Sequence, residues 1–207
     1  MTAVRLAPTH VEFATPQRLR AFGDRPALFD GAWITYRDLA GKVQERVDEL
    51  GPRPTVVAVA QGRNADTIAW MLAALGGGHA LLMFDERGAE ILREYQPECV
   101  VRDGELRRSG RITAIHPELS MLLSTSGSTG SPKLVRLDAN AIVSNATAIG
   151  EYLKLAADDR AITSLPLSYC YGLSVLTSHL AVGAALVMTD LSVVDDCFWE
   201  LARTTGV

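Results

Sequence analysis

The sequence predicts an α/β fold in which mostly parallel sheets are covered by helices. Uncharged apolar runs at residues 56–60, 80–84 and 99–101 are typical of buried strands. Between them, apolar residues recur at helical spacing over residues 68–75 and 89–95. The 207 residues, 48% hydrophobic and 21% charged, are sufficient to bury a core. Strands that alternate with helices pair in parallel, so ligands are expected at the carboxyl ends of the strands.

The segment before these elements predicts a hairpin and then a helix. Residues 27–34 flank the dipeptide Asp30-Gly31, which supplies the positive φ angles of a tight turn. Thr35 and Asp38 have the spacing of an acidic capping box at a helix start. The apolar face of that helix is expected to hold Leu39, Val43, Val47 and Leu50, before Gly51 ends it.

The same alternation continues to the end of the chain. The charged residues 103–111 predict a surface loop or hairpin, and either Asp138 or Asn140 can cap a helix. That helix would present Ile142, Ala146, Ile149 and Leu153 on one face. Further strands are expected at residues 121–123, 134–137, 161–163 and 185–188, and further helices at 173–182 and 195–205.

Composition excludes several classes of function. Twenty basic against 24 acidic residues, a net charge of −4, lack the positive excess that nucleic-acid binding needs. Three cysteines without C-x-x-C spacing indicate reduced, buried thiols rather than a disulfide framework or a zinc site. Residues 1–10 have no apolar run typical of a secretory signal. The uncharged stretches 67–84 and 161–189 contain Gly, Pro, Ser, Thr and His, so we expect buried elements, no membrane span and a cytoplasmic location.

Residues 124–133 differ from the rest of the chain. Six hydroxyl side chains, two glycines and a lysine lie between apolar segments, in the order Ser124, Thr125, Ser126, Gly127, Ser128, Thr129, Gly130, Ser131, Pro132, Lys133. Glycines let backbone amides approach an anion, hydroxyls donate to phosphate oxygens, and lysine adds a mobile charge. Lys133 is also one of only three lysines against 17 arginines. The segment therefore predicts a phosphate-binding loop rather than a flexible Gly/Ser linker.

Two common nucleotide motifs do not fit this loop. A Walker-type loop needs lysine directly after the last glycine and a helix behind it, whereas Ser131 and Pro132 separate Gly130 from Lys133. The residues that follow, Leu134 and Val135, favour a strand. No G-x-G-x-x-G follows a strand, which excludes the dinucleotide-binding fingerprint.

Residues 125–133 resemble the signature loop of the adenylate-forming (AMP-binding) superfamily, which includes acyl-CoA synthetases, nonribosomal peptide synthetase adenylation domains and luciferases. Residues 34–39 are similar to the family's T-Y-x-x-L segment, and residues 73–80 to its alanine/glycine segment. Residues 165–173 are similar to its P-L-x-H-x-x-G segment. The resemblance covers nearly the whole chain and implies part of the large N-terminal domain of the adenylate-forming fold, over residues 1–207.

The resemblance implies a two-step ATP-dependent ligase. A carboxylic acid attacks the α-phosphate of ATP, pyrophosphate leaves, and the acyl group then passes to a thiol of CoA or of a carrier protein. The loop would hold the leaving phosphates while Mg²⁺ spreads their charge. By this resemblance the nucleotide-binding residues are Thr125, Ser126, Gly127, Ser128, Thr129, Gly130 and Lys133.

The acyl pocket is implied at Tyr169 and Gly172. Tyr169 stands where the family often has histidine, and a phenol cannot supply an imidazolium near pH 7. It can line or gate the pocket, or it can be an aromatic side chain packed beside Tyr171 in the core. The four histidines, His10, His79, His116 and His179, have no spacing typical of a ligand set and are expected to be structural.

Several motifs of the family are absent. The sequence has no Y-G-x-T-E segment for Mg²⁺, no Y-R-T-G-D segment for the ribose and no C-terminal catalytic lysine. We therefore expect a truncated gene product or one part of a split ligase, inactive by itself and partnered by the remainder of the enzyme. The alternatives are a nucleotide-binding module without catalysis, and an interaction domain that pairs through an exposed sheet edge.

Overall fold

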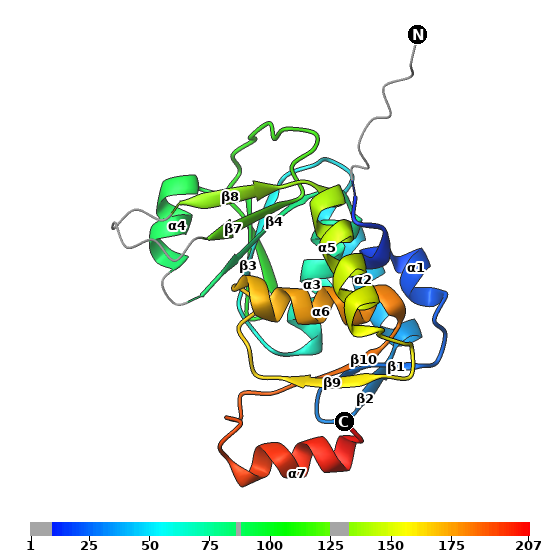
Figure 1. The fold of residues 1–207 in the computed structure, drawn as a ribbon. Coiled ribbons are helices and arrows are strands. Elements are labelled where there is room, and N and C mark those ends of the chain that lie inside the picture. Colours follow the sequence, from blue (N-terminus) through cyan, green and yellow to red (C-terminus); the bar gives the residue numbers. More distant parts are fainter. Residues whose placement is uncertain (1–9, 86–87, 125–132) are drawn as a thin grey trace.

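The strands of the protein form two sheets that face each other across a layer of helices. The computed structural model describes residues 10–85, 88–124 and 133–207. Within these residues the chain forms a four-stranded and a six-stranded sheet, with α2, α3, α5 and α6 between them (Figure 1). The predicted α/β class with mostly parallel sheets covered by helices is confirmed.

The six-stranded sheet has the order β6-β5-β3-β4-β7-β8. Its four inner strands run in parallel, and an antiparallel strand closes each edge. The strands are β3 (Val56–Ala60), β4 (Ala80–Phe84), β5 (Cys99–Arg102), β6 (Glu105–Arg108), β7 (Met121–Ser124) and β8 (Leu134–Leu137). The charged segment after β5 is thus a hairpin, turned at Asp103 and Gly104, which both have positive φ.

The four-stranded sheet has the order β2-β1-β10-β9 and joins segments that are distant in the sequence. Its strands are β1 (Pro26–Phe29), β2 (Trp33–Thr35), β9 (Arg160–Thr163) and β10 (Ala185–Met188). The predicted hairpin is confirmed, but its turn spans residues 30–32 rather than Asp30-Gly31 alone, and of these two residues only Gly31 has a positive φ, at 71°. β1 also pairs in parallel with β10, so that Leu28 lies opposite Leu186.

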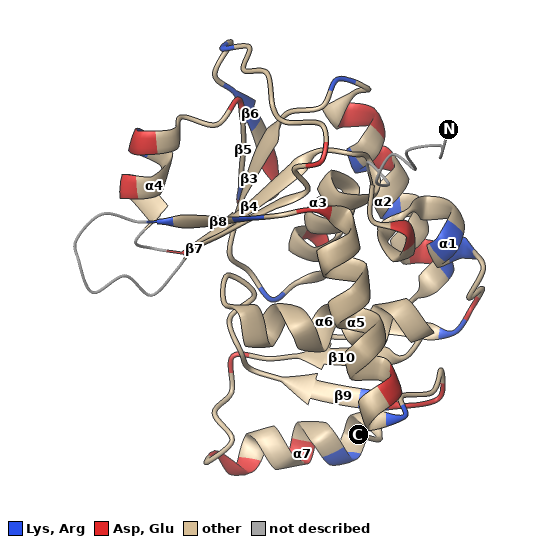
Figure 2. Cartoon of the chain, turned by 45° about the horizontal axis from the view of Figure 1, so that its top comes forward, with Lys and Arg blue, Asp and Glu red and all other residues tan. Residues whose placement is uncertain are grey.

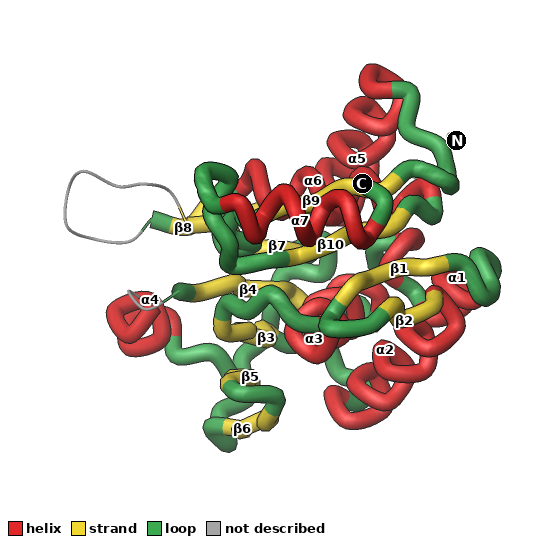
Figure 3. The backbone as a smooth tube through the Cα atoms, turned by 90° about the horizontal axis from the view of Figure 1, so that it is seen from below, coloured by secondary structure: helices red, strands yellow, loops and turns green. Residues whose placement is uncertain are grey.

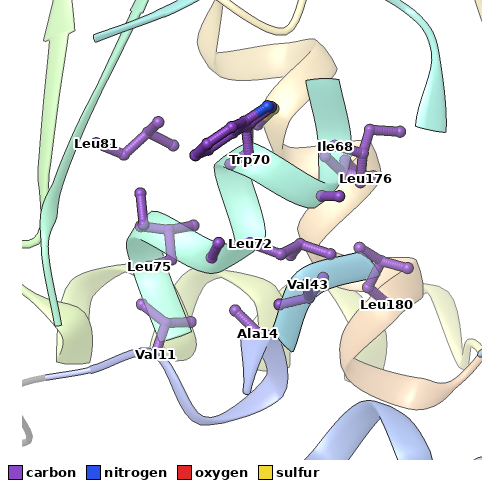
Figure 4. Close-up of a cluster of buried hydrophobic side chains, with 14 of the residues drawn as sticks. Val11, Ala14, Val43, Ile68, Trp70, Leu72, Leu75, Leu81, Leu176 and Leu180 are labelled. Carbon is purple, nitrogen blue, oxygen red and sulfur yellow. The ribbon is translucent and has the colours of Figure 1, made fainter. Parts of the chain in front are cut away.

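The helices between the sheets are almost free of charge on their buried faces. The chain forms a 3₁₀ turn η1 (Glu12–Ala14) and helices α1 (Pro16–Arg20), α2 (Tyr36–Leu50), α3 (Ala65–Gly76), α4 (Gly88–Tyr95), α5 (Ala139–Leu153), α6 (Cys170–Val182) and α7 (Asp196–Thr205). After its first turn, which carries Asp66, α3 is apolar and buried on every side over residues 68–75, because it lies in the centre of the molecule. Figure 4 shows its side chains packed against those of η1, α2, β4 and α6.

The pleat of the strands divides the core in two. Val57, Val59 and Leu81 face the central helices, while Ala58 and Leu82 face the opposite side, where Ile91 of α4 covers them. α7 covers the outer face of the four-stranded sheet, crossing β9 and β10 (Figure 3). No helix in the described part of the chain has the length and apolar composition of a membrane span.

Most predicted elements are confirmed, and their local signals explain them. The capping box at Thr35 and Asp38 is present, and Asp138 rather than Asn140 caps α5. The predicted apolar face of α5 is wrong at its end. Leu153 is exposed, and the last buried residue of the helix is Gly150. The sequence-based prediction also missed α1, although Thr15 and Pro16 stand at its cap and first turn.

Candidate functional site

The ends of the predicted phosphate loop lie at the carboxyl edge of the six-stranded sheet. β7 ends at Ser124, and β8 begins at Leu134 directly opposite it in the antiparallel ladder. Lys133 therefore immediately precedes a strand, as the sequence predicts, and its side chain is exposed. Thr125, Ser126, Gly127, Ser128, Thr129 and Gly130 lie outside the described residues.

Two neighbouring strands end at the same edge. β3 and β4 run parallel to β7, and Gln61 and Asp85 follow them. The backbone N–H of Gln61 donates to the carbonyl of Phe84 over 2.7 Å, which holds the two strand ends together. This is the edge at which parallel sheets receive ligands.

The segment implied for the acyl pocket lies at the carboxyl edge of the other sheet. The chain leaves β9 at Thr163, makes a turn, and enters α6 at Cys170. Tyr169 has extended backbone and is the N-terminal cap residue of α6, with its carbonyl accepting from the N–H of Leu173 at 3.1 Å. α6 contains no Asp, Glu, Lys or Arg, and its ribbon carries no charge colour in Figure 2.

The aromatic side chains at the start of α6 point to solvent. Tyr169 is 56% exposed and Tyr171 is 64% exposed. The alternative that Tyr169 packs beside Tyr171 in the core is therefore wrong. Because its phenol is accessible at the edge of the sheet, Tyr169 is available to line or gate a site there.

Gly172 is buried where α6 approaches the preceding turn. A Cβ atom at this position would lie 2.4 Å from the carbonyl oxygen of Pro166 and 2.9 Å from that of Leu165. Real Cβ atoms do not approach backbone that closely, so a side chain would push α6 away from the turn. Glycine here sets the path of residues 165–172 by permitting this close approach.

A side-chain hydrogen bond joins the two edges. The hydroxyl of Ser168 donates to Oε1 of Gln61 over 2.5 Å, which connects the turn before α6 to the end of β3. Neither residue, nor Arg63 in the same loop, was identified as a site residue from the sequence. A signal was available for Gln61, because a residue directly after a buried parallel strand lies at the ligand-binding edge.

The described histidines do not belong to a metal-binding cluster. His79 and His179 are buried, and burial lowers the pKa of both rings below the ordinary value of 6.5. Among the residues that the structure describes, no three His, Cys, Asp or Glu side chains come together in a way that could hold a metal ion.

The cysteines differ from the prediction of buried thiols. Cys99 is buried, and burial raises the pKa of its thiol. Cys170 and Cys197 are exposed, so the prediction is wrong for these two residues. All three thiols are free.

Two surface cavities lie away from this edge. One, of about 390 Å³, opens at the amino ends of β1, β9 and β10, and is lined by Arg25, Pro26, Ala157, Asp158, Asp159, Arg160 and Ala185. The other, of about 320 Å³, lies at the opposite end of β7 from Ser124. Parallel sheets bind ligands at their carboxyl ends. The convergence of strand ends therefore indicates the site better than these cavities do.

Comparison with known proteins connects this fold to an enzyme family. Residues 113–207 match the AMP-binding enzyme family. Over 206 residues the chain is 28% identical to CymA of Salinispora arenicola, a probable non-canonical nonribosomal peptide synthetase, covering 91% of this chain and 2% of that protein. It is 26% identical to 2-succinylbenzoate–CoA ligase of Haemophilus influenzae, covering 90% of this chain and 44% of the ligase. The chain thus spans less than half the length of these relatives.

A solved structure shares the fold over nearly the whole chain. A nonribosomal peptide synthetase protein containing adenylation and PCP domains, bound to a vinylsulfonamide inhibitor, superposes with a TM-score of 0.77 at 22% identity. The superposition covers 96% of this chain and 40% of that one. Residues 113–207 therefore resemble the AMP-binding enzyme family, and the chain as a whole shares the fold of part of a protein that contains an adenylation domain.

Proposed function

We propose that this chain is the phosphate-binding and acyl-pocket part of an ATP-dependent adenylate-forming ligase. In this proposal residues 124–133 bind the β- and γ-phosphates of ATP, through the hydroxyls and amides of residues 125–130 and the ammonium group of Lys133. Tyr169 and Gly172 shape one side of the pocket for the carboxylic acid. Residues 1–207 then form an N-terminal portion of the adenylate-forming domain.

One observation carries the proposal. The loop with the family's signature joins β7 to β8 at the carboxyl edge of a parallel sheet, the edge that also receives Gln61 and, through it, the segment 164–172. A phosphate group at the loop and a carboxylate beside Tyr169 would therefore meet where both sheets end. The accessible cation of Lys133 and the accessible phenol of Tyr169 fit these two roles.

The proposed chemistry has two steps. A carboxylate oxygen forms a bond to the α-phosphorus as the bond to the β-phosphate oxygen breaks, which gives acyl-AMP and pyrophosphate. A thiol of CoA or of a carrier protein then attacks the acyl carbon, loses its proton and expels AMP. Mg²⁺ bound with ATP would neutralise phosphate charge. Lys133 would stabilise the negative charge that builds up on the leaving pyrophosphate.

The loop assignment is tested by removing the charge of Lys133. We expect Lys133→Ala to weaken binding of MgATP and of pyrophosphate by about tenfold or more, because a charge-assisted hydrogen bond contributes roughly 1.5–3 kcal/mol. Isothermal titration calorimetry on the 207-residue chain measures both affinities. Lys42→Ala is the matched control, because Lys42 is an exposed lysine on α2.

Three results separate the candidates. Unchanged nucleotide affinity in Lys133→Ala would contradict the phosphate-loop assignment. Tight MgATP binding without ATP–pyrophosphate exchange, tested with the carboxylic acids of the family, would favour a nucleotide-binding module. Exchange that depends on Lys133 but not on Lys42 would support a ligase.

A further inference from the structure

The loop that follows β3 (residues 61–64, the β3–α3 loop) and the first residue of α3 together contact the ends of all three parallel strands of the other sheet. Arg63 pairs through Nη1 with Asp190, which follows β10. Its Nη2 donates to the carbonyl of Ser164, directly after β9, over 2.7 Å. The N–H of Ala65, the first residue of α3, donates to the carboxylate of Asp30 after β1 over 3.0 Å.

Arg63 has the chemistry needed to hold two separate groups. Its side chain is only 18% exposed, although its partner Asp190 is 82% exposed. The guanidinium directs two nitrogens to two acceptors, Ser164 and Asp190, that follow different strands. The planar fork of arginine can make both bonds at fixed geometry, whereas a lysine ammonium has no such fork.

The same loop is fixed to the phosphate-loop sheet. Gln61 is bonded through its backbone to Phe84 at the end of β4 and through its side chain to Ser168. The loop also continues directly from β3, which is separated from β7 in the sheet by β4 alone. Any shift of the loop relative to β9 and β10 would therefore change how residues 164–172 lie relative to the edge of the six-stranded sheet where β7 ends and β8 begins.

We propose that Arg63 is a positioning residue, which sets the distance and orientation between the segment 164–172 and the adjoining ends of β7 and β8, at Ser124 and Leu134. The catalytic consequence of this inference rests on the proposed function, which assigns the segment 164–172 to the acyl group and the loop between β7 and β8 to ATP. Arg63 acts through Ser164 and Asp190. Alignment of two reactants is sensitive to displacements of about 1 Å, which can cost a hundredfold in rate.

A distance measurement between the two sheets tests the inference. Spin labels are placed on exposed Cys170 at the start of α6 and on Arg136→Cys in β8, in a chain carrying Cys197→Ser, while buried Cys99 stays unlabelled. Double electron–electron resonance then reports the distribution of distances. We expect Arg63→Met to broaden or shift this distribution, and Arg63→Lys to give a smaller change because it keeps the charge without the fork.

The control is another arginine–aspartate pair. Arg37→Met removes the exposed pair with Asp24 and is expected to leave the distribution unchanged. An unchanged distribution in folded Arg63→Met would overturn the inference, as would an equal change in Arg37→Met. If Arg63→Met does not fold, Arg63→Lys decides, since a distribution identical to that of the parent protein also overturns it.

A kinetic measurement distinguishes positioning from general destabilisation. Where ATP–pyrophosphate exchange is observed, Arg63→Met is expected to lower kcat by about tenfold or more while KM for ATP changes less than about threefold. If Arg63→Met changed kcat and KM for ATP by the same factor, a positioning role would be contradicted. If the proposed function is wrong, MgATP binding will be absent or insensitive to Lys133→Ala. The distances between the spin labels do not depend on that result, so the two failures can be distinguished.

Discussion

At the scale of single residues, close backbone approaches distinguish glycines that look alike in the sequence. Gly172 and Gly41 both lie inside helices, but only Gly172 has carbonyl oxygens within the space of a Cβ atom. The family resemblance places Gly172 at the acyl pocket, which stays a prediction, and the structure shows in addition its close approach to the carbonyl of Pro166. Arg63 could not be predicted in this way, because its acceptors Ser164 and Asp190 are more than 100 positions away along the chain.

Gly172→Ala is expected to destabilise the protein and to disturb the turn before α6. Relieving the overlap with the carbonyl of Pro166 should cost about 1–3 kcal/mol, which corresponds to a melting point lower by roughly 2–10 °C. Gly41→Ala is the control, with no atom within 4 Å of its added Cβ, and should raise stability by about 0.5–1 kcal/mol. Thermal unfolding followed by circular dichroism measures both variants. If Gly172→Ala and Gly41→Ala changed the melting point equally, the account would be refuted.

At the scale of elements, apolar runs and caps were sufficient to locate most strands and helices. β3 and β4 are continuous apolar runs because both faces of their sheet are covered, one by α3 and the other by α4. The pairing of β1 with β10 could not be predicted, because each strand alone is a short apolar segment and their partnership depends on packing across the whole chain. The short helix α1 was missed for a similar reason, since five residues carry little helical periodicity.

A buried carboxylate fastens two elements at the amino edge of the six-stranded sheet. Glu98, next to β5, accepts from the hydroxyl of Thr55 beside β3 over 3.1 Å and pairs with Arg53. Burial raises the pKa of Glu98, but hydrogen bonds from Arg53 and Thr55 and the charges of Arg53 and Arg108 outweigh it and lower the pKa below the ordinary 4.5. The charged carboxylate is therefore favoured by folding.

This pair predicts a pH-dependent loss of stability. Because the folded pKa is the lower one, the contribution is complete above pH 4.5 and is lost as the pH falls through the folded value. Glu98→Gln should lower stability at pH 7 by about 1–2 kcal/mol, with a smaller difference from the wild type at pH 3.5. Urea unfolding at both pH values measures this. Glu105→Gln, which removes an exposed pair with Arg107, should have little effect, and a pH-independent difference for Glu98→Gln would contradict the assignment.

At the scale of the whole molecule, the two sheets share one core. Leu28 and Leu186 of the four-stranded sheet belong to the same buried cluster as Val57 and Leu81 of the six-stranded sheet. The buried hydroxyl of Tyr36 donates to the carbonyl of Ala184 over 2.7 Å, and burial raises the pKa of this phenol. A site assembled from the carboxyl edges of both sheets depends on this shared core as well as on Arg63.

The shared core predicts that both sheets unfold together. Amides of β4 and β10 should exchange with solvent only through global opening, with the same free energy and the same dependence on urea. α7 and α4 cover outer faces and should open earlier, which makes them internal references for local unfolding. Native-state hydrogen exchange measures all four elements in one experiment. If β10 opened at a free energy lower than that of β4 by more than about 1–2 kcal/mol, the sheets would be separate units, and the site would have to be formed by their association.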